Sequence, residues 1–191
     1  MTDSTIDFRE LTPGAARMLE VASELFYEQG IHPVGVDTIA AESGVTKPIL
    51  YKNFGSKDGL VVAYLRNRHQ NWWHELEETI SRTQSPRALA FFDVYAKDNG
   101  DGHRGCAFLN AAAELPEDHP ALDVIRYHKH SICDRLEELV REDAPADTDH
   151  RHLANHLFLL LEGAYAHRTI YGTQLLSEGR EMAAALLKSD E

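Results

Sequence analysis

Apolar residues recur three and four positions apart along most of the sequence, and runs of alternating or β-branched residues are scarce. This period is typical of amphipathic α-helices, because residues at that spacing share one helical face. In the first periodic segment, Thr12 fits an N-cap, Pro13 fits the first helical position and Gly30 ends the helix. The apolar stripe between them consists of Met18, Leu19, Ala22, Leu25 and Phe26. The pattern therefore predicts an all-α protein.

Two short periodic segments follow this helix, at about residues 37–43 and 47–53, with Gly44 between them. A turn at Gly55 then leads into a long helix that Ser56 caps. The spacing thus predicts two short helices joined by a tight turn, followed by a long one.

The second half of the sequence continues the helical period. One helix opens at Ser85-Pro86 and runs out in a loop over residues 98–102. The remaining helices are predicted at about residues 106–115, 121–142 and 149–171 and, after Gly172, to about Leu187. We therefore expect about nine helices in all.

The two short helices match the helix-turn-helix arrangement, in which the second helix enters the major groove of DNA. Ala40 is placed where the two helices cross closely, and Gly44 can supply a left-handed turn. The core beneath them is predicted to contain Val45, Leu50 and Phe54.

Charge supports a local DNA site rather than a protein that is basic throughout. The chain has 191 residues and a formal net charge of −12. Residues 44–70 nevertheless hold five basic side chains and one acidic one, while the rest of the chain is acidic. The basic residues are Lys47, Lys52, Lys57, Arg66 and Arg68.

The residues of this region resemble a known family. The strings Thr38-Ile-Ala-Ala-Glu-Ser-Gly-Val-Thr-Lys47 and Leu50-Tyr-Lys-Asn-Phe-Gly-Ser-Lys57 are similar to the DNA-binding domain of the tetracycline-repressor (TetR) family. Glu24-Leu-Phe26 and Gly30 extend the resemblance back into the first helix. It implies a DNA-binding domain at residues 10–55 and a helical effector-binding and dimerisation domain at residues 56–191.

The DNA contacts are expected on the second short helix and at its ends. Thr46 is the predicted N-cap, beside backbone amides that can meet a phosphate. Lys47 and Lys52 can reach phosphate oxygens or guanine acceptors, and Tyr51 can offer its hydroxyl to a phosphate. Asn53 lies on the same predicted face.

Pro48 and Ile49 depart from the family pattern, which commonly has small or hydroxyl-bearing residues there. Contact with thymine methyl groups is therefore the expected use of these two side chains. Thr38 and Lys57 are further candidates for phosphate contacts.

The effector pocket is expected among aromatic and polar residues after the DNA-binding domain. The candidates are Trp72, Phe92, Tyr95, Phe108, Asn110, Tyr127, Phe158, Glu162 and Tyr165. Glu162 stands in an apolar run, where a buried carboxylate needs a partner such as a ligand, an arginine or another subunit.

The predicted helix at 149–171 is apolar on two neighbouring stripes. One stripe can bury the helix in its own subunit, and the second needs another chain. A homodimer through the helices at about 121–142 and 149–171 is therefore expected, and the family resemblance also implies it.

The spacing of the histidines and cysteines favours ordinary packing over metal or redox chemistry. His152 and His156 share a helical face, but no third ligand stands at a suitable spacing, so we expect no metal site. Cys106 and Cys133 lie 27 positions apart and suggest neither a disulfide framework nor a zinc finger. No catalytic pattern stands out, and no cofactor is expected.

These features predict a cytoplasmic, homodimeric regulator that binds double-stranded operator DNA of pseudo-palindromic sequence, with no membrane partner. We expect a repressor that a small apolar or amphipathic effector releases from DNA. Two alternatives stay open. One is an all-α small-molecule-binding module or enzyme with a structural helix pair, and the other is a regulator switched by redox or metal chemistry.

Overall fold

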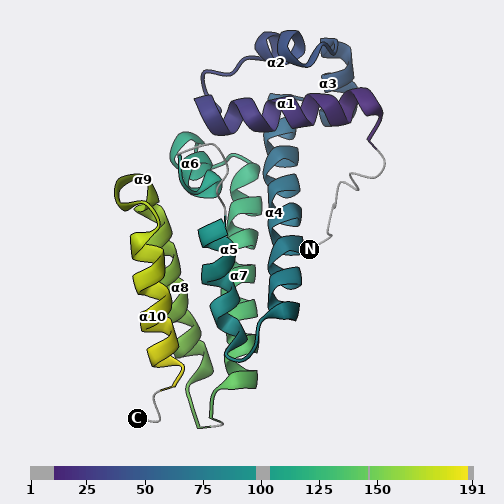
Figure 1. Cartoon of the computed structure of the whole chain (residues 1–191). Coiled ribbons are helices and arrows are strands. Elements are labelled where there is room, and N and C mark those ends of the chain that lie inside the picture. The colour runs from purple at the N-terminus through teal and green to yellow at the C-terminus, as the bar shows by residue number, and fades with distance from the viewer. Residues whose placement is uncertain (1–10, 98–103, 146, 189–191) are drawn as a thin grey trace. The chain divides into compact units, whose positions relative to one another are not determined.

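The computed structural model describes residues 11–97, 104–145 and 147–188, and all regular structure in these ranges is helical (Figure 1). The expected all-α class is confirmed, with ten α-helices and one short 3-10 helix in the described ranges. They are α1 (Pro13–Gln29), α2 (Val36–Ser43), α3 (Lys47–Phe54), α4 (Lys57–Arg82), η2 (Arg87–Leu89), α5 (Ala90–Lys97), α6 (Ala107–Glu114), α7 (Ala121–Asp143), α8 (His150–Ala166), α9 (Arg168–Tyr171) and α10 (Gln174–Leu186).

The chain forms two compact units. The first comprises residues 1–70 and 107–125, and the second comprises residues 71–106 and 126–191. Helix α6 therefore belongs to the same unit as α1, α2 and α3, although it follows them by about fifty residues of sequence. The functional division at residue 55 stays a prediction.

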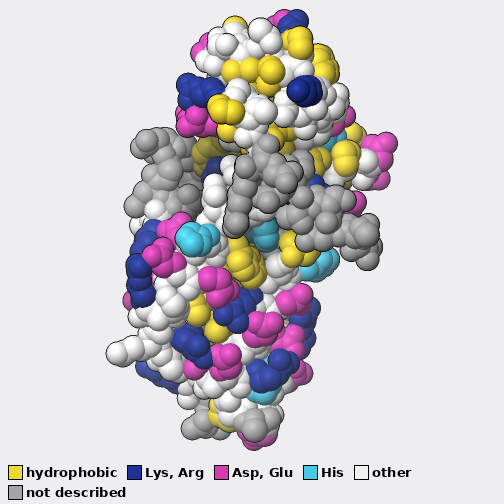
Figure 2. All heavy atoms as spheres, turned by 90° about the vertical axis from the view of Figure 1, so that its right-hand side faces the viewer, with side chains coloured by type: hydrophobic (Ala, Val, Ile, Leu, Met, Phe, Trp, Pro, Cys, Tyr) yellow, Lys and Arg dark blue, Asp and Glu magenta, His cyan; other side chains and the backbone are white. Residues whose placement is uncertain are grey.

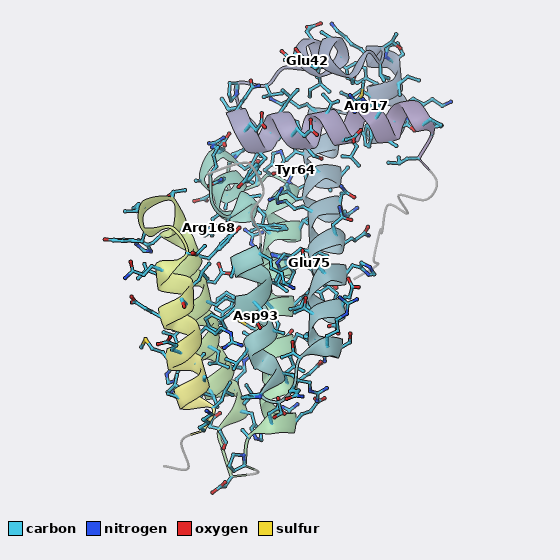
Figure 3. All side chains as sticks on the ribbon, in the orientation of Figure 1. Arg17, Glu42, Tyr64, Glu75, Asp93 and Arg168 are labelled. Atoms are coloured by element: carbon cyan, nitrogen blue, oxygen red, sulfur yellow. The ribbon has the colours of Figure 1, made fainter. Side chains whose placement is uncertain are left out.

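In the first unit, α1 begins and ends as its sequence predicts. Ala15 N donates to Thr12 Oγ1 at 3.3 Å, and Gly30, with φ of 95°, closes the helix through its amide and the Phe26 carbonyl. Met18 and Ala22 of the predicted stripe are fully buried. Phe26 packs on Tyr64 of α4, with ring centroids 5.8 Å apart (Figure 3).

In the second unit, α10 lies beside α8 and also contacts α5 (Figure 1). The helices pack closely at Gly179 of α10, where a Cβ would lie at ordinary contact distance, 3.4 Å from Phe92 and 3.7 Å from Ala164. Arg180 of α10 donates to Asp93 of α5 at 2.8 Å (Figure 3). Apolar packing and one half-exposed ion pair thus join α10 to α5.

Two helix boundaries differ from those predicted. The segment 149–171 is not one helix, because α8 ends at Ala166 and the short α9 follows. His167 Nδ1 lies 2.8 Å from the Gly163 carbonyl and competes for the acceptor that a continuing helix would use. After Ser85-Pro86, the chain forms the 3-10 helix η2 before α5 begins at Ala90.

The loop expected at residues 98–102 lies outside the described residues. Among the helices that the structure describes, none is long and apolar enough to cross a membrane.

Candidate functional site

Helices α2 and α3 form the predicted helix pair. Gly44 between them is left-handed, with φ of 66° and ψ of 16°, and its amide donates to the Ala41 carbonyl. Ile39 and Leu50 are completely buried beneath the pair, and Phe54 is buried beside them. Leu50 and Phe54 mark the buried side of α3, and the opposite side of this helix is exposed.

The exposed side of α3 carries the residues that can contact DNA. Lys47, Pro48, Tyr51 and Lys52 are all exposed, and about half of the Tyr51 surface is accessible. Thr46 stands at the N-cap position without a side-chain capping bond. Its hydroxyl and the Lys47 amide are therefore available to an anion, because Pro48 has no N–H and the Ile49 amide donates to the Thr46 carbonyl at 3.0 Å.

Two residues predicted on this side are only half exposed. Ile49 lies near α1, where a Cβ built on Gly14 would be 3.9 Å from its Cγ2. Asn53 turns its amide back to the helix, donating to the Ile49 carbonyl at 2.7 Å. Both residues therefore contribute to the packing of α3 as well as to its surface.

The five basic residues of this region do not all project freely. Lys47 pairs with Asp37 of α2, and that hydrogen bond raises the pKa of the Lys47 ammonium. Arg68 stacks over the Tyr27 ring at 4.5 Å. Lys52 is exposed and makes no ion pair with any described residue. The positive charge that α3 offers is thus concentrated at Lys52, because Asp37 neutralises Lys47.

The turn after α1 is held from two sides. Glu114 of α6 accepts from the backbone amides of Ile31 at 2.6 Å and His32 at 3.0 Å. Lys57 of α4 donates to the Ile31 carbonyl at 2.6 Å and, more weakly, to the His32 carbonyl at 3.4 Å. Burial lowers the pKa of the Lys57 ammonium. We refer to Glu114, Lys57 and the backbone of residues 31 and 32 as the turn clamp.

A second contact joins the start of α4 to the segment after α6. His119 Nδ1 accepts from the Ala121 amide at 3.1 Å, which leaves Nε2 to carry the proton. That nitrogen lies 3.5 Å from Asp58 Oδ1. Both ends of the α6 segment therefore contact residues at or near the helix pair.

An aromatic cluster occupies the core of the second unit. Trp72 of α4 meets Tyr95 edge-on at 5.6 Å and His128 at 5.1 Å between ring centroids. Tyr95 in turn meets Tyr165 of α8 at 4.6 Å. Phe91 closes the group at 6.2 Å from Trp72. These rings come from α4, α5, α7 and α8 and form one contiguous aromatic wall.

A charged pair lies against this wall. Lys129 Nζ contacts both oxygens of Glu162, at 2.7 and 2.6 Å, and each side chain is about 85% buried. Tyr95 donates its hydroxyl to Glu162 Oε1 at 2.9 Å, and burial raises the pKa of Tyr95 well above its ordinary value. Lys129 Nζ also lies 3.6 Å from the Cys106 thiol. The partner that Glu162 requires is thus a lysine of its own chain.

Comparison with known proteins identifies this architecture. A family profile described as "Bacterial regulatory proteins, tetR family" matches residues 18–64. The crystal structure of SCO4454, a TetR-family transcriptional regulator from Streptomyces coelicolor, aligns with a TM-score of 0.86 at 31% identity, covering 94% of this chain and 91% of that one. The chain belongs to the TetR family. This family comprises DNA-binding transcriptional regulators, so the alternative of an enzyme is excluded.

Two curated TetR-like relatives match over shorter segments. The transcriptional activator FasR of Mycolicibacterium smegmatis is 35% identical over 94 residues, which is 46% of this chain and 42% of FasR. The transcriptional regulator BetI of Brucella anthropi is 31% identical over 70 residues, 37% of this chain and 36% of BetI. The matched segments therefore span less than half the length of either relative.

The predicted pocket residues of this TetR-family chain fall into three groups. Trp72, Tyr95, Tyr165 and Glu162 meet in the aromatic cluster. Phe92 is buried, Phe158 is half-buried and Tyr127 is 64% exposed. Phe108 and Asn110 belong to the first compact unit, with the helix pair. The pocket role of each residue stays a prediction.

Lys129, His128 and Glu114 are not among the residues that the sequence predicts for these sites. Lys129 and His128 stand on a charged stretch of α7, and Glu114 stands at a helix end, where acidic residues are common. A charge in an otherwise apolar helix, such as Glu162, is the signal that could have prompted a search for Lys129.

The turn clamp gives a first testable expectation. Glu114→Ala removes the acceptor of two backbone amides and should lower the free energy of unfolding by ~1–3 kcal/mol. Glu114→Gln keeps one carbonyl oxygen and should lose less. Chemical denaturation followed by circular dichroism measures the stability, and hydrogen exchange should speed up at the amides of Ile31 and His32.

Glu117→Ala is the matched control, because Glu117 is an exposed carboxylate three residues away. If Glu114→Ala and Glu117→Ala unfold alike and exchange alike at residues 31 and 32, the clamp does not stabilise the turn.

Proposed function

We propose that this chain represses transcription by binding a pseudo-palindromic operator as a homodimer in the cytoplasm, and that a small effector releases it. The observation that carries the DNA-binding part is the exposed side of α3, with Tyr51 and Lys52 outward over buried Leu50 and Phe54. Repression is proposed because we expect the effector to release the protein from its operator. It is not carried over from the relatives, of which FasR is named an activator.

The proposed contacts divide by chemistry. Lys52 reaches phosphate or a guanine edge, and Tyr51 donates its hydroxyl to phosphate. Thr46 and the Lys47 amide meet a second phosphate, while Pro48 offers an apolar surface to thymine methyl groups. Further proposed contacts are Thr38, Lys47, Ile49, Asn53 and Lys57.

Lys57 has two roles in this proposal. An ammonium group has three donors, and the turn clamp uses two of them. The third remains for a phosphate oxygen. Loss of Lys57 would therefore weaken both the turn and a backbone contact.

Lys52→Ala and Tyr51→Phe should each weaken operator binding by about fivefold or more at fixed salt, since each removes one contact to DNA. Folding and oligomeric state should not change, because both side chains are exposed. Gel shift or fluorescence anisotropy with the operator isolated from genomic fragments measures the affinity.

Lys188→Ala removes an exposed lysine near the end of α10 and serves as the matched control. Wild-type affinity in both α3 variants would remove α3 from the DNA interface.

The aromatic cluster supports an apolar or amphipathic effector. Its charged groups, Lys129 and Glu162, neutralise each other, so neither is left to bind a ligand of high charge. On the face drawn in Figure 2, the basic and acidic side chains of the second unit are intermixed rather than gathered by sign. An effector that binds at the aromatic cluster therefore carries little net charge.

Release from DNA follows from linkage. An effector lowers operator affinity by the difference between its affinities for the DNA-binding and released states, typically about 1–3 kcal/mol. Helices α4 and α7 each run from one compact unit into the other. They supply continuous elements through which an effector in the second unit can bias the first.

A screen of small molecules should yield apolar or amphipathic compounds that raise the melting temperature and release the protein from DNA. These compounds should change the fluorescence of the Trp73→Phe protein, in which Trp72 is the remaining tryptophan. The change should be smaller in Trp72→Phe, because the Trp72 ring contacts Tyr95 at 5.6 Å and is itself part of the cluster. Polyanions as the releasing compounds would contradict the proposal.

The dimer interface is proposed on α8 and α10. Leu157, on an apolar stripe of α8, is completely buried in its own unit and so is not part of the interface. The exposed apolar side chains of α8 and α10 are Leu159, Met182 and Leu186. These two helices lie side by side (Figure 1). Helix α7 exposes mostly charged side chains besides Tyr127. α10 therefore replaces α7 in the expected four-helix interface.

Leu159→Glu should convert the dimer to monomers that lose operator binding, because it places a carboxylate in the apolar interface and each half-site alone offers too few contacts. Size-exclusion chromatography with light scattering measures the mass. Tyr127→Glu is the control: it puts the same charge at an exposed aromatic position of α7 and should remain dimeric. A dimeric Leu159→Glu protein together with a monomeric Tyr127→Glu protein would place the interface on α7 instead.

A further inference from the structure

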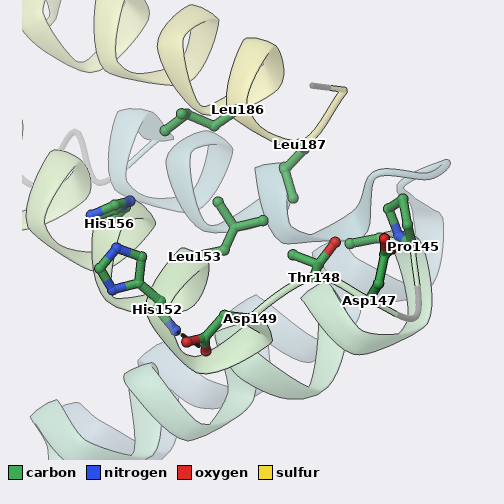
Figure 4. Close-up of a pocket in the computed structure, with 10 residues that line it drawn as sticks. Pro145, Asp147, Thr148, Asp149, His152, Leu153, His156, Leu186 and Leu187 are labelled. Atoms are coloured by element: carbon green, nitrogen blue, oxygen red, sulfur yellow. Dashed lines mark hydrogen bonds between the residues drawn. The ribbon is translucent and has the colours of Figure 1, made fainter. Parts of the chain in front are cut away.

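A hollow of about 420 Å³ lies where α8 begins, next to the end of α10 (Figure 4). Its walls include Asp147, Asp149, His152, His156, Leu186 and Leu187. None of the proposed DNA or effector contacts belongs to it. Of its wall residues, Leu186 also belongs to the proposed dimer interface, but the proposed DNA and effector contacts do not use the hollow.

His152 and His156 lie one above the other on the same side of α8, as their spacing of four residues requires (Figure 4). Their ring centroids are 4.2 Å apart, and the rings are inclined at 64°. Both side chains are exposed. Among the described residues, none forms a hydrogen bond with a ring nitrogen of His152 or His156. His150 differs, because its Nε2 lies 3.2 Å from the Pro145 carbonyl.

The charges around the two rings favour a cation. Asp147 and Asp149 line the hollow, and Asp149 Oδ1 accepts from the His152 amide at 3.0 Å, which offsets the positive end of the helix. No lysine or arginine is among the described residues of its wall. The nearby Arg151 is paired with Asp134 and Glu137 at 2.9 Å.

Although the lack of a third protein ligand predicts no metal site from the sequence, we propose from the ring geometry that His152 and His156 chelate a divalent first-row transition metal ion, with Zn²⁺ as the representative. Neutral imidazole nitrogens are good ligands for such ions at about 2.0–2.1 Å, and rotation of the two exposed rings can bring one nitrogen of each to a common ion. The described residues gather no group of three or more potential ligands. Water therefore fills the other positions, and the site is open and exchangeable.

The ion would tie the first turn of α8 to the second. The same helix carries Leu159 and Glu162 further on, so the bound ion stiffens the start of an element that both the proposed interface and the aromatic cluster use. The metal site itself depends on neither, because it needs only the two imidazoles. It can be tested on the free protein without DNA or effector.

The experiment uses the full chain without an affinity tag, stripped with a chelator and titrated with Zn²⁺ against a competing zinc dye. One ion per chain should bind, and His152→Ala and His156→Ala should each weaken that binding by roughly tenfold or more. His150→Ala should bind as the wild type does. Ni²⁺, which is paramagnetic, should broaden the ring proton signals of His152 and His156 first.

Since both histidines are exposed, the variants should keep the wild-type circular dichroism spectrum. Unchanged zinc affinity in His152→Ala and His156→Ala would overturn the proposal. So would nickel broadening that begins at other histidines. Neither result would bear on operator binding through α3.

Discussion

Glu114 accepts hydrogen bonds from two successive backbone amides at the turn that follows α1, and Lys57 donates to the carbonyls of the same turn. A backbone that reverses direction beside a core leaves amides and carbonyls without helical partners, and unpaired ones are costly. These contacts satisfy them from α6 and α4. Because α2 starts directly after the turn, the presentation of α3 depends on where α6 holds that turn.

The local parts of this fold could be predicted from the sequence because their causes lie within a few residues. Thr12 caps α1, Gly44 is left-handed, and Leu50 and Phe54 are buried as their spacing indicates. Contacts between distant segments could not be predicted in this way. Glu114 meets Ile31 across 83 positions and Lys129 meets Glu162 across 33, and neither spacing follows a local rule.

Charge illustrates the same difference. A count of residues 44–70 indicates a strongly basic region, yet Lys47 is paired with Asp37 and Arg68 stacks on Tyr27. Asp37 lies outside the counted stretch, so only the fold reveals the pairing. The helical period also does not predict that the helix is interrupted within residues 149–171. The cause is the His167 side chain, which competes there with the backbone for the Gly163 carbonyl.

The Lys129–Glu162 pair also constrains how this protein can diverge over evolutionary time. Replacement of either residue alone leaves an uncompensated charge amid aromatic rings, whereas replacement of both by apolar residues of similar volume costs little. Homologues should therefore retain the two positions together or lose them together. A lineage that loses both would keep the aromatic cluster without an ionic pair at its edge.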